Sequence, residues 1–301
     1  MSRCGARREG MFRKNNSGRG DRRAIMRYNR VISFTFTGGR PLISYIEQFF
    51  RDPKGMFTFF LLAFPGRILA LSLHEFAHAW VAHRCGDDTA KNLGRMTINP
   101  LKHLDPLGTV LMLVVGFGWA KPVPVNPRNY RNPRADDLKV SIAGVTMNLI
   151  MFIVGNILML VFLAAAIRRE TDPTVGQYLR MLFERYDYYN VAIYQVRTSF
   201  GEVAGYLFQM LYYFTVTNLV LCVFNLLPVP PLDGYHVLND LVLRRRQLFA
   251  NPQTARIAST VLFVLVLTGV VGRALGWVDS QILTGAGNLS VAALRALGLI
   301  A

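Results

Sequence analysis

Residues 71–84 read LSLHEFAHAWVAHR, and they decide the fold class because they place three polar groups inside an apolar helix. Residues four apart lie on one helix face, so the imidazoles of His74 and His78 can point at a single ion. Glu75, beside the first histidine, can reach a water bound to that ion. This spacing is typical of a zinc hydrolase, in which two histidine ligands and a general base leave room for a third ligand and the reacting water.

The surroundings of these residues strengthen the prediction. Residues 68–82 are apolar on the other helix faces as well, which indicates a helix at membrane depth rather than a soluble amphipathic helix with one polar stripe. Two histidines and a carboxylate at that depth are costly unless they are paired or bind a metal. Ionisable groups in such a place are therefore candidates for a functional site.

The composition indicates an integral membrane protein. Of the 301 residues, 52% are hydrophobic and only 17% are charged, which is less charge than most soluble domains carry. Four apolar segments have about the length that crosses a bilayer as a helix, roughly 20 residues; they cover residues 56–84, 138–167, 203–227 and 257–277. We expect an all-α polytopic membrane protein with about four transmembrane helices, surrounded by a lipid bilayer.

The net charge of +16 does not indicate a nucleic-acid partner, because the basic residues lie between apolar segments and in the N-terminal tail rather than on one folded face. Residues 84–139 and 244–256 carry an excess of lysine and arginine, whereas residues 168–202 form a polar, tyrosine-rich connection of balanced charge. The positive-inside rule places the first two in the cytoplasm. We expect a multi-pass protein of the plasma membrane with its site towards the cytoplasmic side.

The chain divides into a basic tail, residues 1–40, and a membrane-embedded core, residues 41–301. The tail carries eleven lysines and arginines against two acidic residues and lacks the apolar core of a secretory signal, so we expect it to be disordered. It either binds lipid headgroups or lies upstream of the natural start, for which Met26 and Met56 are both candidates. Residues 41–51 are predicted to form a short interfacial helix, and residues 278–301 a further interfacial or partial helix.

Residues 105–125, DPLGTVLMLVVGFGWAKPVPV, are apolar but too short and glycine-broken for a full span. The alternation in residues 121–125 is typical of an extended edge strand, where proline is tolerated. We therefore predict a short membrane-associated β-hairpin or re-entrant segment, which must be buried in protein or line a water-filled cavity.

A zinc ion held by two histidines needs a third protein ligand. Asp233 is the strongest candidate, because it is a lone carboxylate after thirty uncharged residues and follows a turn whose three prolines cannot continue a helix. The competing interpretation is that Asp233 caps a helix over residues 234–243. The remaining histidines are weaker candidates: His83, His103 and His236. Three cysteines without a CxxC pair indicate neither a disulfide framework nor a cysteine zinc site.

Five segments together resemble the site-2 metalloproteases, a family that cleaves peptide bonds inside membranes. They cover most of residues 56–277 in the order and spacing of that family: HEFAH at 74–78, GRMTINPLKHLDPLGT at 94–109, GWAKPVPVNPRNYRNP at 118–133, AGVTMN at 143–148 and FNLLPVPPLDG at 224–234. The chain looks like the compact subgroup without PDZ or CBS domains, since no connection is long enough to hold either.

The resemblance implies one Zn²⁺ per chain, bound by His74, His78 and Asp233, with Glu75 as the catalytic base. Asn148 matches the asparagine of the family's GxxxN motif, which implies a catalytic role in positioning the substrate or stabilising the oxyanion. An asparagine that only bonds neighbouring membrane helices is the competing interpretation.

The implied reaction is the hydrolysis of peptide bonds within or near the transmembrane segments of membrane-anchored proteins. The expected partner is therefore a membrane-spanning protein substrate. An exposed strand can bind such a substrate by β-augmentation, which makes Lys121, Val123 and Val125 candidate substrate contacts. Asn225, at the end of the third predicted span, is a further candidate.

Three alternatives compete with this interpretation. A catalytically silent binding or scaffold protein of the same fold predicts the loss of Glu75 or of a ligand, and all are present. A zinc-handling or transport protein usually has more spans and repeat symmetry. The other type of membrane-anchored zinc protease takes a glutamate as third ligand, and no later span contains a comparable one.

Overall fold

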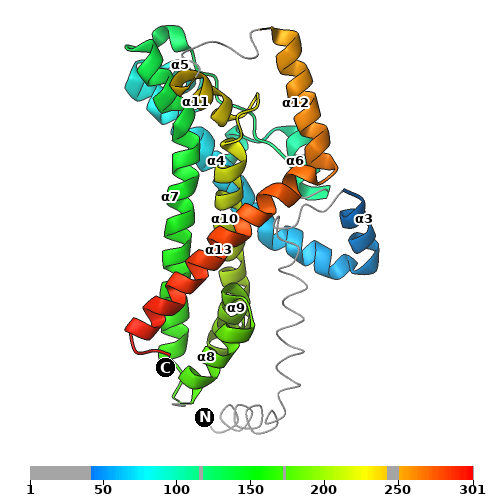
Figure 1. Ribbon diagram of the computed structural model, residues 1–301, viewed down its shortest axis with the longest axis vertical. Helices are drawn as coiled ribbons and strands as arrows, with labels where there is room; N and C mark the ends of the chain where they lie inside the picture. The colour runs from blue at the N-terminus through cyan, green and yellow to red at the C-terminus, as the bar shows by residue number, and fades with distance from the viewer. Residues whose placement is uncertain (1–41, 115–117, 172–173, 243–250, 301) are drawn as a thin grey trace.

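The computed structural model describes residues 42–114, 118–171, 174–242 and 251–300, and these residues are mostly helical. Three helices are long and apolar enough to cross a membrane: α4 (Pro53–Cys85), α7 (Pro133–Arg168) and α10 (Glu202–Asn225). They pack against one another at the centre of the molecule (Figure 1). The predicted all-α architecture is confirmed, and each of these helices matches a predicted span. The predicted tail, residues 1–40, lies outside the described residues.

Helix α4 carries the histidine motif, and its start is fixed by a cap. Asp52 Oδ1 accepts a hydrogen bond from the Gly55 N–H at 2.9 Å. Pro53 takes the first helical position, where the missing N–H has no partner to lose. Most side chains between this cap and Cys85 are apolar, so the helix can lie among its neighbours and lipid along most of its length.

The fourth predicted span is broken. Helices α12 (Pro252–Leu267) and α13 (Val270–Ala296) meet at an angle of 70°, which makes the pair a broken span or a re-entrant arrangement. Gly269 lies at the break with a φ of 75°, a left-handed conformation that other residues rarely adopt. Helix α13 continues through Trp277, where the span was predicted to end, and crosses α10 diagonally (Figure 1).

Residues 168–202, predicted as a polar connection, instead contain two helices, α8 (Val175–Arg185) and α9 (Tyr188–Phe200). Helix α9 is largely buried against α7, α10 and α13, where its tyrosines and aliphatic residues join the main apolar core. Tyr189 is only 1% exposed and packs its ring on Tyr212. The charges that suggested a loop lie mostly on α8 and at the helix ends.

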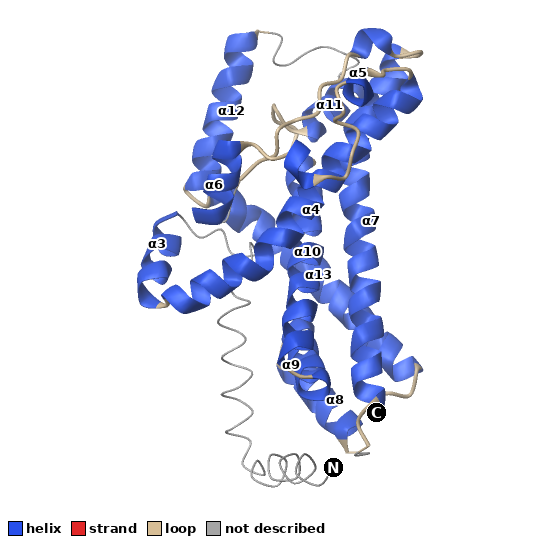
Figure 2. Ribbon diagram, turned by 180° about the vertical axis from the view of Figure 1, so that it is seen from behind, coloured by secondary structure: helices blue, strands red, loops and turns tan. Residues whose placement is uncertain are grey.

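Shorter helices complete the described part of the chain. Helix α3 (Leu42–Arg51) matches the predicted short helix and packs beside α4 (Figure 2). Between α4 and α7 lie α5 (Thr89–Asn92), η2 (Pro100–Lys102), α6 (Pro106–Val114) and η3 (Pro127–Asn129). Helix α11 (Asp233–Leu241) follows α10 and packs against α7.

The predicted β-hairpin is wrong for the described residues, among which no strand occurs (Figure 2). An isolated antiparallel bridge joins Leu104 and Ala120. Residues 115–117, inside the predicted hairpin, lie outside the described residues. The re-entrant alternative stays a prediction.

The reason lies in the backbone of residues 121–125. Pro122 and Pro124 have no N–H to donate to a neighbouring strand. The Lys121 N–H donates to the His103 carbonyl at 2.7 Å. The Val123 N–H donates to the Glu75 carboxylate at 2.8 Å. The segment is extended, but its hydrogen bonds go to a loop and a side chain instead of a second strand.

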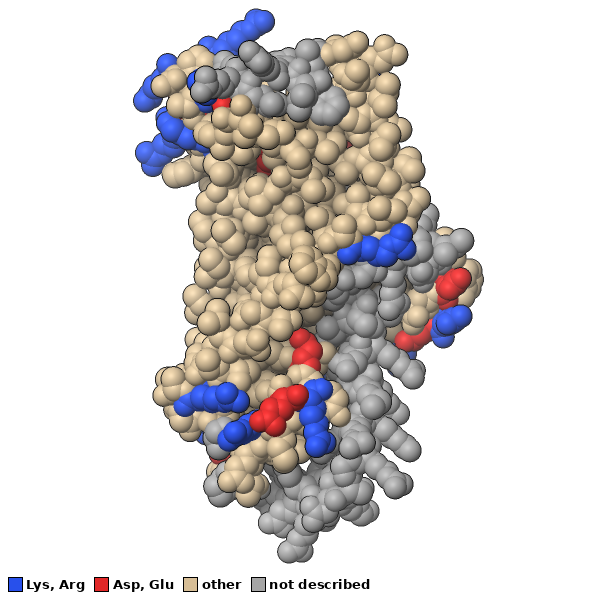
Figure 3. Space-filling view, viewed as in Figure 1, with Lys and Arg blue, Asp and Glu red and all other residues tan. Residues whose placement is uncertain are grey.

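Charged side chains gather at the two ends of the bundle, with a nearly uncharged band between them on the face seen in Figure 3. The end around α5, η3 and the start of α7 exposes basic residues: Arg84, Lys91, Arg128, Arg131, Arg134 and Lys139. The opposite end, around α8, mixes both signs: Arg180, Glu184, Arg185 and Asp187. Helix α7 exposes large apolar side chains along the band, as a lipid-facing helix does: Ile150, Ile153, Ile157 and Val161.

Candidate metal centre

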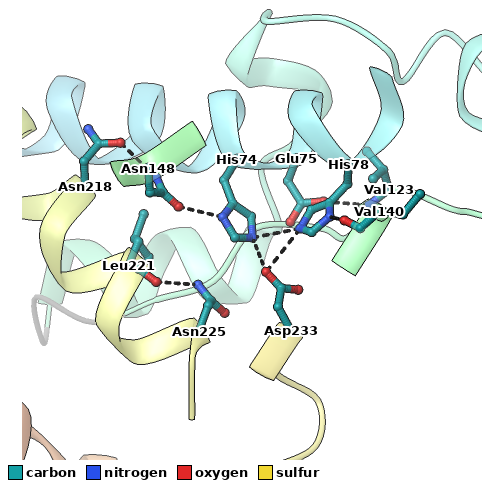
Figure 4. Close-up of polar contacts among 10 residues, drawn as sticks. All are labelled: His74, Glu75, His78, Val123, Val140, Asn148, Asn218, Leu221, Asn225 and Asp233. Carbon is teal, nitrogen blue, oxygen red and sulfur yellow. Dashed lines mark hydrogen bonds and ion pairs between the residues drawn. The ribbon is translucent and has the colours of Figure 1, made fainter. Parts of the chain in front are cut away.

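Three side chains predicted as metal ligands meet at one point (Figure 4). His74 and His78 lie on one face of α4, and Asp233 is the first residue of α11. Asp233 Oδ2 lies 3.4 Å from Nε2 of each histidine, and the two Nε2 atoms lie 3.1 Å apart. Within the described ranges, these residues form the only group of three or more His, Cys, Asp or Glu side chains close enough to hold a metal ion.

The turn between α10 and α11 brings the carboxylate to α4. It runs over residues 226–232, and its three prolines prevent the two helices from joining into one. Gly234 packs tightly on this turn, because a Cβ there would lie 2.3 Å from the Leu226 carbonyl oxygen. The N-cap of α11 is Leu232, and no side chain caps the helix. The alternative that Asp233 serves as the cap is therefore wrong.

The second nitrogen of each imidazole is also engaged. The His78 Nδ1–H donates to the Val140 carbonyl at 2.7 Å, and the His74 Nδ1–H donates to Asn148 Oδ1 at 2.6 Å. Since a backbone carbonyl can only accept, His78 must carry its proton on Nδ1, which leaves the Nε2 lone pair free. Metal-bound histidines commonly have such a partner on the nitrogen away from the metal.

This donor set fits zinc. In a tetrahedral site with Zn–N bonds of about 2.0–2.1 Å, ligand atoms lie about 3.3–3.4 Å apart. The three separations here are 3.1, 3.4 and 3.4 Å. Asp233 Oδ2 is buried and has no hydrogen-bond partner. A buried carboxylate oxygen facing two imidazole lone pairs is unfavourable unless a cation joins them.

Glu75 lies beside this group on the next position of α4 (Figure 4). Its Oε2 accepts the hydrogen bond from the Val123 N–H, which fixes the orientation of the carboxylate. The residue is half-buried rather than sealed in the core. Two imidazoles and two carboxylates give the arrangement of a hydrolytic zinc site.

Comparison with known families matches residues 60–269, more than half of the chain, to "Peptidase family M50". The chain belongs to peptidase family M50. It is also 39% identical over 197 residues to "Putative zinc metalloprotease YwhC" of Bacillus subtilis, covering 65% of this chain and 75% of that relative. "Putative zinc metalloprotease Rip2" of Mycolicibacterium smegmatis is 28% identical over 255 residues, covering 81% of this chain and 80% of the relative. No solved structure matches the chain.

Membership of family M50 confirms the predicted resemblance to the site-2 metalloproteases. The protein is a zinc-dependent metalloprotease, and a silent scaffold or a zinc carrier is not favoured. The histidine, glutamate and aspartate side chains described above all lie within the matched residues. Among the described residues, the only group that could hold a metal ion contains Asp233 and no glutamate, which does not favour a glutamate as third ligand.

Gly144 is the glycine of the GxxxN motif, and the sequence alone assigned it no role at the metal group. A Cβ on it would lie 2.4 Å from both His78 Nε2 and His74 Cε1, so the backbone of α7 packs directly on the two imidazoles. The available signal was its spacing of four from Asn148, which places both on one face of α7. Glycine is required here by the close approach.

The predicted substrate contacts divide into two kinds. Lys121 and Val125 are exposed, whereas the Val123 side chain is 8% exposed and packs with Ala79 and Ala90. Val123 contacts Glu75, beside the metal group, through its backbone N–H. Asn225 lies at the end of α10 next to the ligands, and its Nδ2 donates to the Leu221 carbonyl at 2.9 Å (Figure 4).

The other histidines of the described chain stay outside the metal group. The His83 Nδ1 pairs with Asp88. The His103 Nε2–H donates to the Thr97 carbonyl at 2.7 Å. The His236 ring makes an edge-to-face contact with Tyr235 in the first turn of α11. Position alone had already ranked them below Asp233 as ligands.

Proposed function

We propose that this M50 protein hydrolyses peptide bonds within or near the transmembrane segments of membrane-anchored proteins, with His74, His78 and Asp233 as its zinc ligands. One observation carries the proposal: these ligands converge at tetrahedral spacing beside Glu75, on a helix that is long and apolar enough to span a bilayer. A substrate that reaches the site from the bilayer must itself lie in the membrane.

Glu75 is proposed as the general base. Zinc, when bound, lowers the pKa of its water towards about 7 and polarises the scissile carbonyl. The Val123 N–H holds one oxygen of the Glu75 carboxylate, which leaves the other to accept the proton of the attacking water. The same carboxyl group then delivers that proton to the leaving amine. The half-buried position strengthens these interactions, since little water competes with them.

Residues 121–125 are proposed to hold the unwound substrate next to the base. The peptide bonds of a helix are shielded by their own hydrogen bonds, so a transmembrane substrate must become extended before attack. The Val123 N–H contacts Glu75, so a peptide laid along this segment lies beside the reacting water. The exposed side chains of Lys121 and Val125, with Asn225 across the site, are the proposed contacts.

We propose that the protein lies in the plasma membrane and that its site faces the cytoplasm. Helix α5, η3 and the start of α7 lie at the same end of the bundle as α11, and the exposed side chains there are predominantly basic (Figures 1 and 3). The opposite end carries both signs. The positive-inside rule then orients the α11 end inward.

The proposal is tested by mapping cleavage products with mass spectrometry after co-expression with candidate single-span proteins. We expect cuts within or beside the transmembrane segment, and none with Glu75→Gln, which retains every ligand and therefore its zinc. Equal cleavage by Glu75→Gln, or cuts confined to soluble domains, would contradict it.

A further inference from the structure

We propose that Asn148 and Asn218 form a relay that fixes the tautomer of His74, and that Asn218 is thereby a positioning residue for the zinc site. The inference rests on the proposed zinc ligands. It assigns a role to a residue of α10 that touches neither the metal group nor the substrate segment. It also gives Asn148 a role different from oxyanion stabilisation.

The relay is a continuous line of hydrogen bonds across three helices (Figure 4). The Asn218 Nδ2 donates to the Phe214 carbonyl at 2.8 Å. The Asn148 Nδ2 donates to Asn218 Oδ1 at 2.8 Å. Asn148 Oδ1 then accepts from the His74 Nδ1–H at 2.6 Å. Both asparagines are 0% exposed, so water cannot replace any of these partners.

The polarity of this line follows from its far end. The Phe214 carbonyl can only accept, so Asn218 must direct its NH₂ towards it and its Oδ1 towards Asn148. Asn148 must then direct its NH₂ towards Asn218 and its Oδ1 towards His74. An oxygen facing His74 Nδ1 requires the proton on that nitrogen. The Nε2 lone pair is thereby left for the metal.

Asn148 needs this second amide because its two ends differ little in shape. If Asn148 turned over, its NH₂ would face His74 Nδ1 and favour the tautomer with the proton on Nε2, which cannot bind zinc. His78 is held by the Val140 carbonyl, which has no such alternative. The tautomer of His74, in contrast, depends on the orientation of the Asn148 amide, which can turn over.

The same contacts argue against a direct catalytic contact by Asn148. Its Nδ2, the group that an oxyanion would need, donates to Asn218 inside the bundle. Its Oδ1 accepts from a zinc ligand. Both ends of the amide are occupied and buried, so Asn148 acts through His74.

The test measures zinc affinity of the purified full chain by competition with a chelator, together with the visible absorption spectrum of the Co²⁺-substituted protein. Asn218→Leu is expected to lower zinc affinity roughly 10–100-fold, the range found when partners of metal-bound histidines are removed. It should also alter the Co²⁺ spectrum. Asn218→Asp, whose protonated carboxyl group keeps both a donor towards the Phe214 carbonyl and an acceptor towards Asn148, should restore most of the affinity.

A double variant separates the relay from a general structural effect. A carboxylate at position 148 has two acceptor ends and cannot present the wrong polarity to His74. In the Asn148→Asp background, Asn218→Leu should therefore change zinc affinity little. The matched control is Asn156→Leu, which removes the half-buried hydrogen bond from the Tyr189 hydroxyl to Asn156, outside the relay, and should leave zinc affinity unchanged.

Wild-type affinity in a folded Asn218→Leu protein would overturn the relay, and so would an equal loss in both backgrounds. If Asn218→Leu does not fold, the comparison of Asn148→Asp with Asn148→Leu decides, since the relay predicts near-normal affinity only for the aspartate. A wild-type protein that binds no zinc would instead refute the proposed ligands. The two failures are thus distinguishable.

Discussion

Asn148 and Asn156 lie two helical turns apart on α7, yet they serve two regions of different character. Asn148 sits at the metal-centre end, where its amide accepts a hydrogen bond from the His74 imidazole, whose Nε2 lies 3.4 Å from the Asp233 carboxylate. Asn156 sits at the α9 end, where its Oδ1 accepts from the Tyr189 hydroxyl at 2.8 Å amid packed aromatic rings. Asn148 fixes the tautomer of His74, whereas Asn156 reinforces the packing around Tyr189. The two asparagines differ in role because their neighbours differ.

The largest expected effect comes from adding one methyl group at the metal-centre end. Gly144→Ala places a Cβ 2.4 Å from both imidazoles, so at least one ligand must move and zinc should be lost together with cleavage. The matched control is Gly155→Ala on the same helix, whose Cβ would meet Thr215 Oγ1 at 2.2 Å away from the ligands. It should lower stability and keep one zinc per chain. Equal zinc content in both variants, measured by mass spectrometry of the metal, would remove the distinction between the two regions.

Removing a core side chain at the α9 end should lower the stability of the fold without changing zinc affinity. Tyr189→Ala removes a fully buried ring and should lower the free energy of unfolding by about 3–5 kcal/mol, the usual range for large aromatic truncations. Zinc affinity should be unchanged under conditions where the variant stays folded, because distant sites without shared partners behave independently. Denaturant unfolding in detergent and chelator competition measure the two quantities. A parallel loss of zinc affinity would show that the regions are coupled.

A smaller effect is expected at the proposed substrate segment. Val125→Asp adds a charge at an exposed position and should reduce kcat/KM for a membrane substrate on the order of tenfold with zinc retained. Val123→Asp buries the charge against Ala79 and Ala90 and should destabilise the fold instead. Activity assays with parallel metal analysis separate the two. Unchanged cleavage by a folded Val125→Asp protein would count against the proposed contact.

The smallest effect should come from a single hydroxyl. Tyr189→Phe removes the hydrogen bond to Asn156 and keeps the ring, so unfolding should become easier by only about 1 kcal/mol. The measurement is the same unfolding titration used for Tyr189→Ala. A loss as large as that of the alanine variant would mean that the hydroxyl, not the packing, stabilises this end.

The convergence of His74, His78 and Asp233, the proposed metal ligands, was predictable because its signal in the sequence is local and chemical. His74 and His78 share a helix face by spacing, and Asp233 is an isolated carboxylate after a proline-rich turn in an apolar segment. Helix α7 and helix α10 were predictable from length and apolar composition. In each case the decisive information lies within one stretch of sequence.

The features that were not predicted from the sequence depend on contacts between distant segments. Gly144 and Asn218 matter only because α7 and α10 lie against α4, which no local pattern specifies. Helix α9 was taken for part of a polar connection because the balanced charges of residues 168–202 obscured its tyrosines and aliphatic residues, which are buried against α7, α10 and α13. The β-hairpin was wrong because the Val123 N–H finds its acceptor on Glu75, 48 residues away in the chain.

The zinc K-edge X-ray absorption spectrum of the purified protein tests the central claim most directly. We expect one zinc per chain with two imidazole nitrogens and a carboxylate oxygen at about 2.0–2.2 Å, and a changed first shell in Asp233→Ala. A sulfur ligand, or a spectrum that Asp233→Ala leaves unaltered, would contradict it.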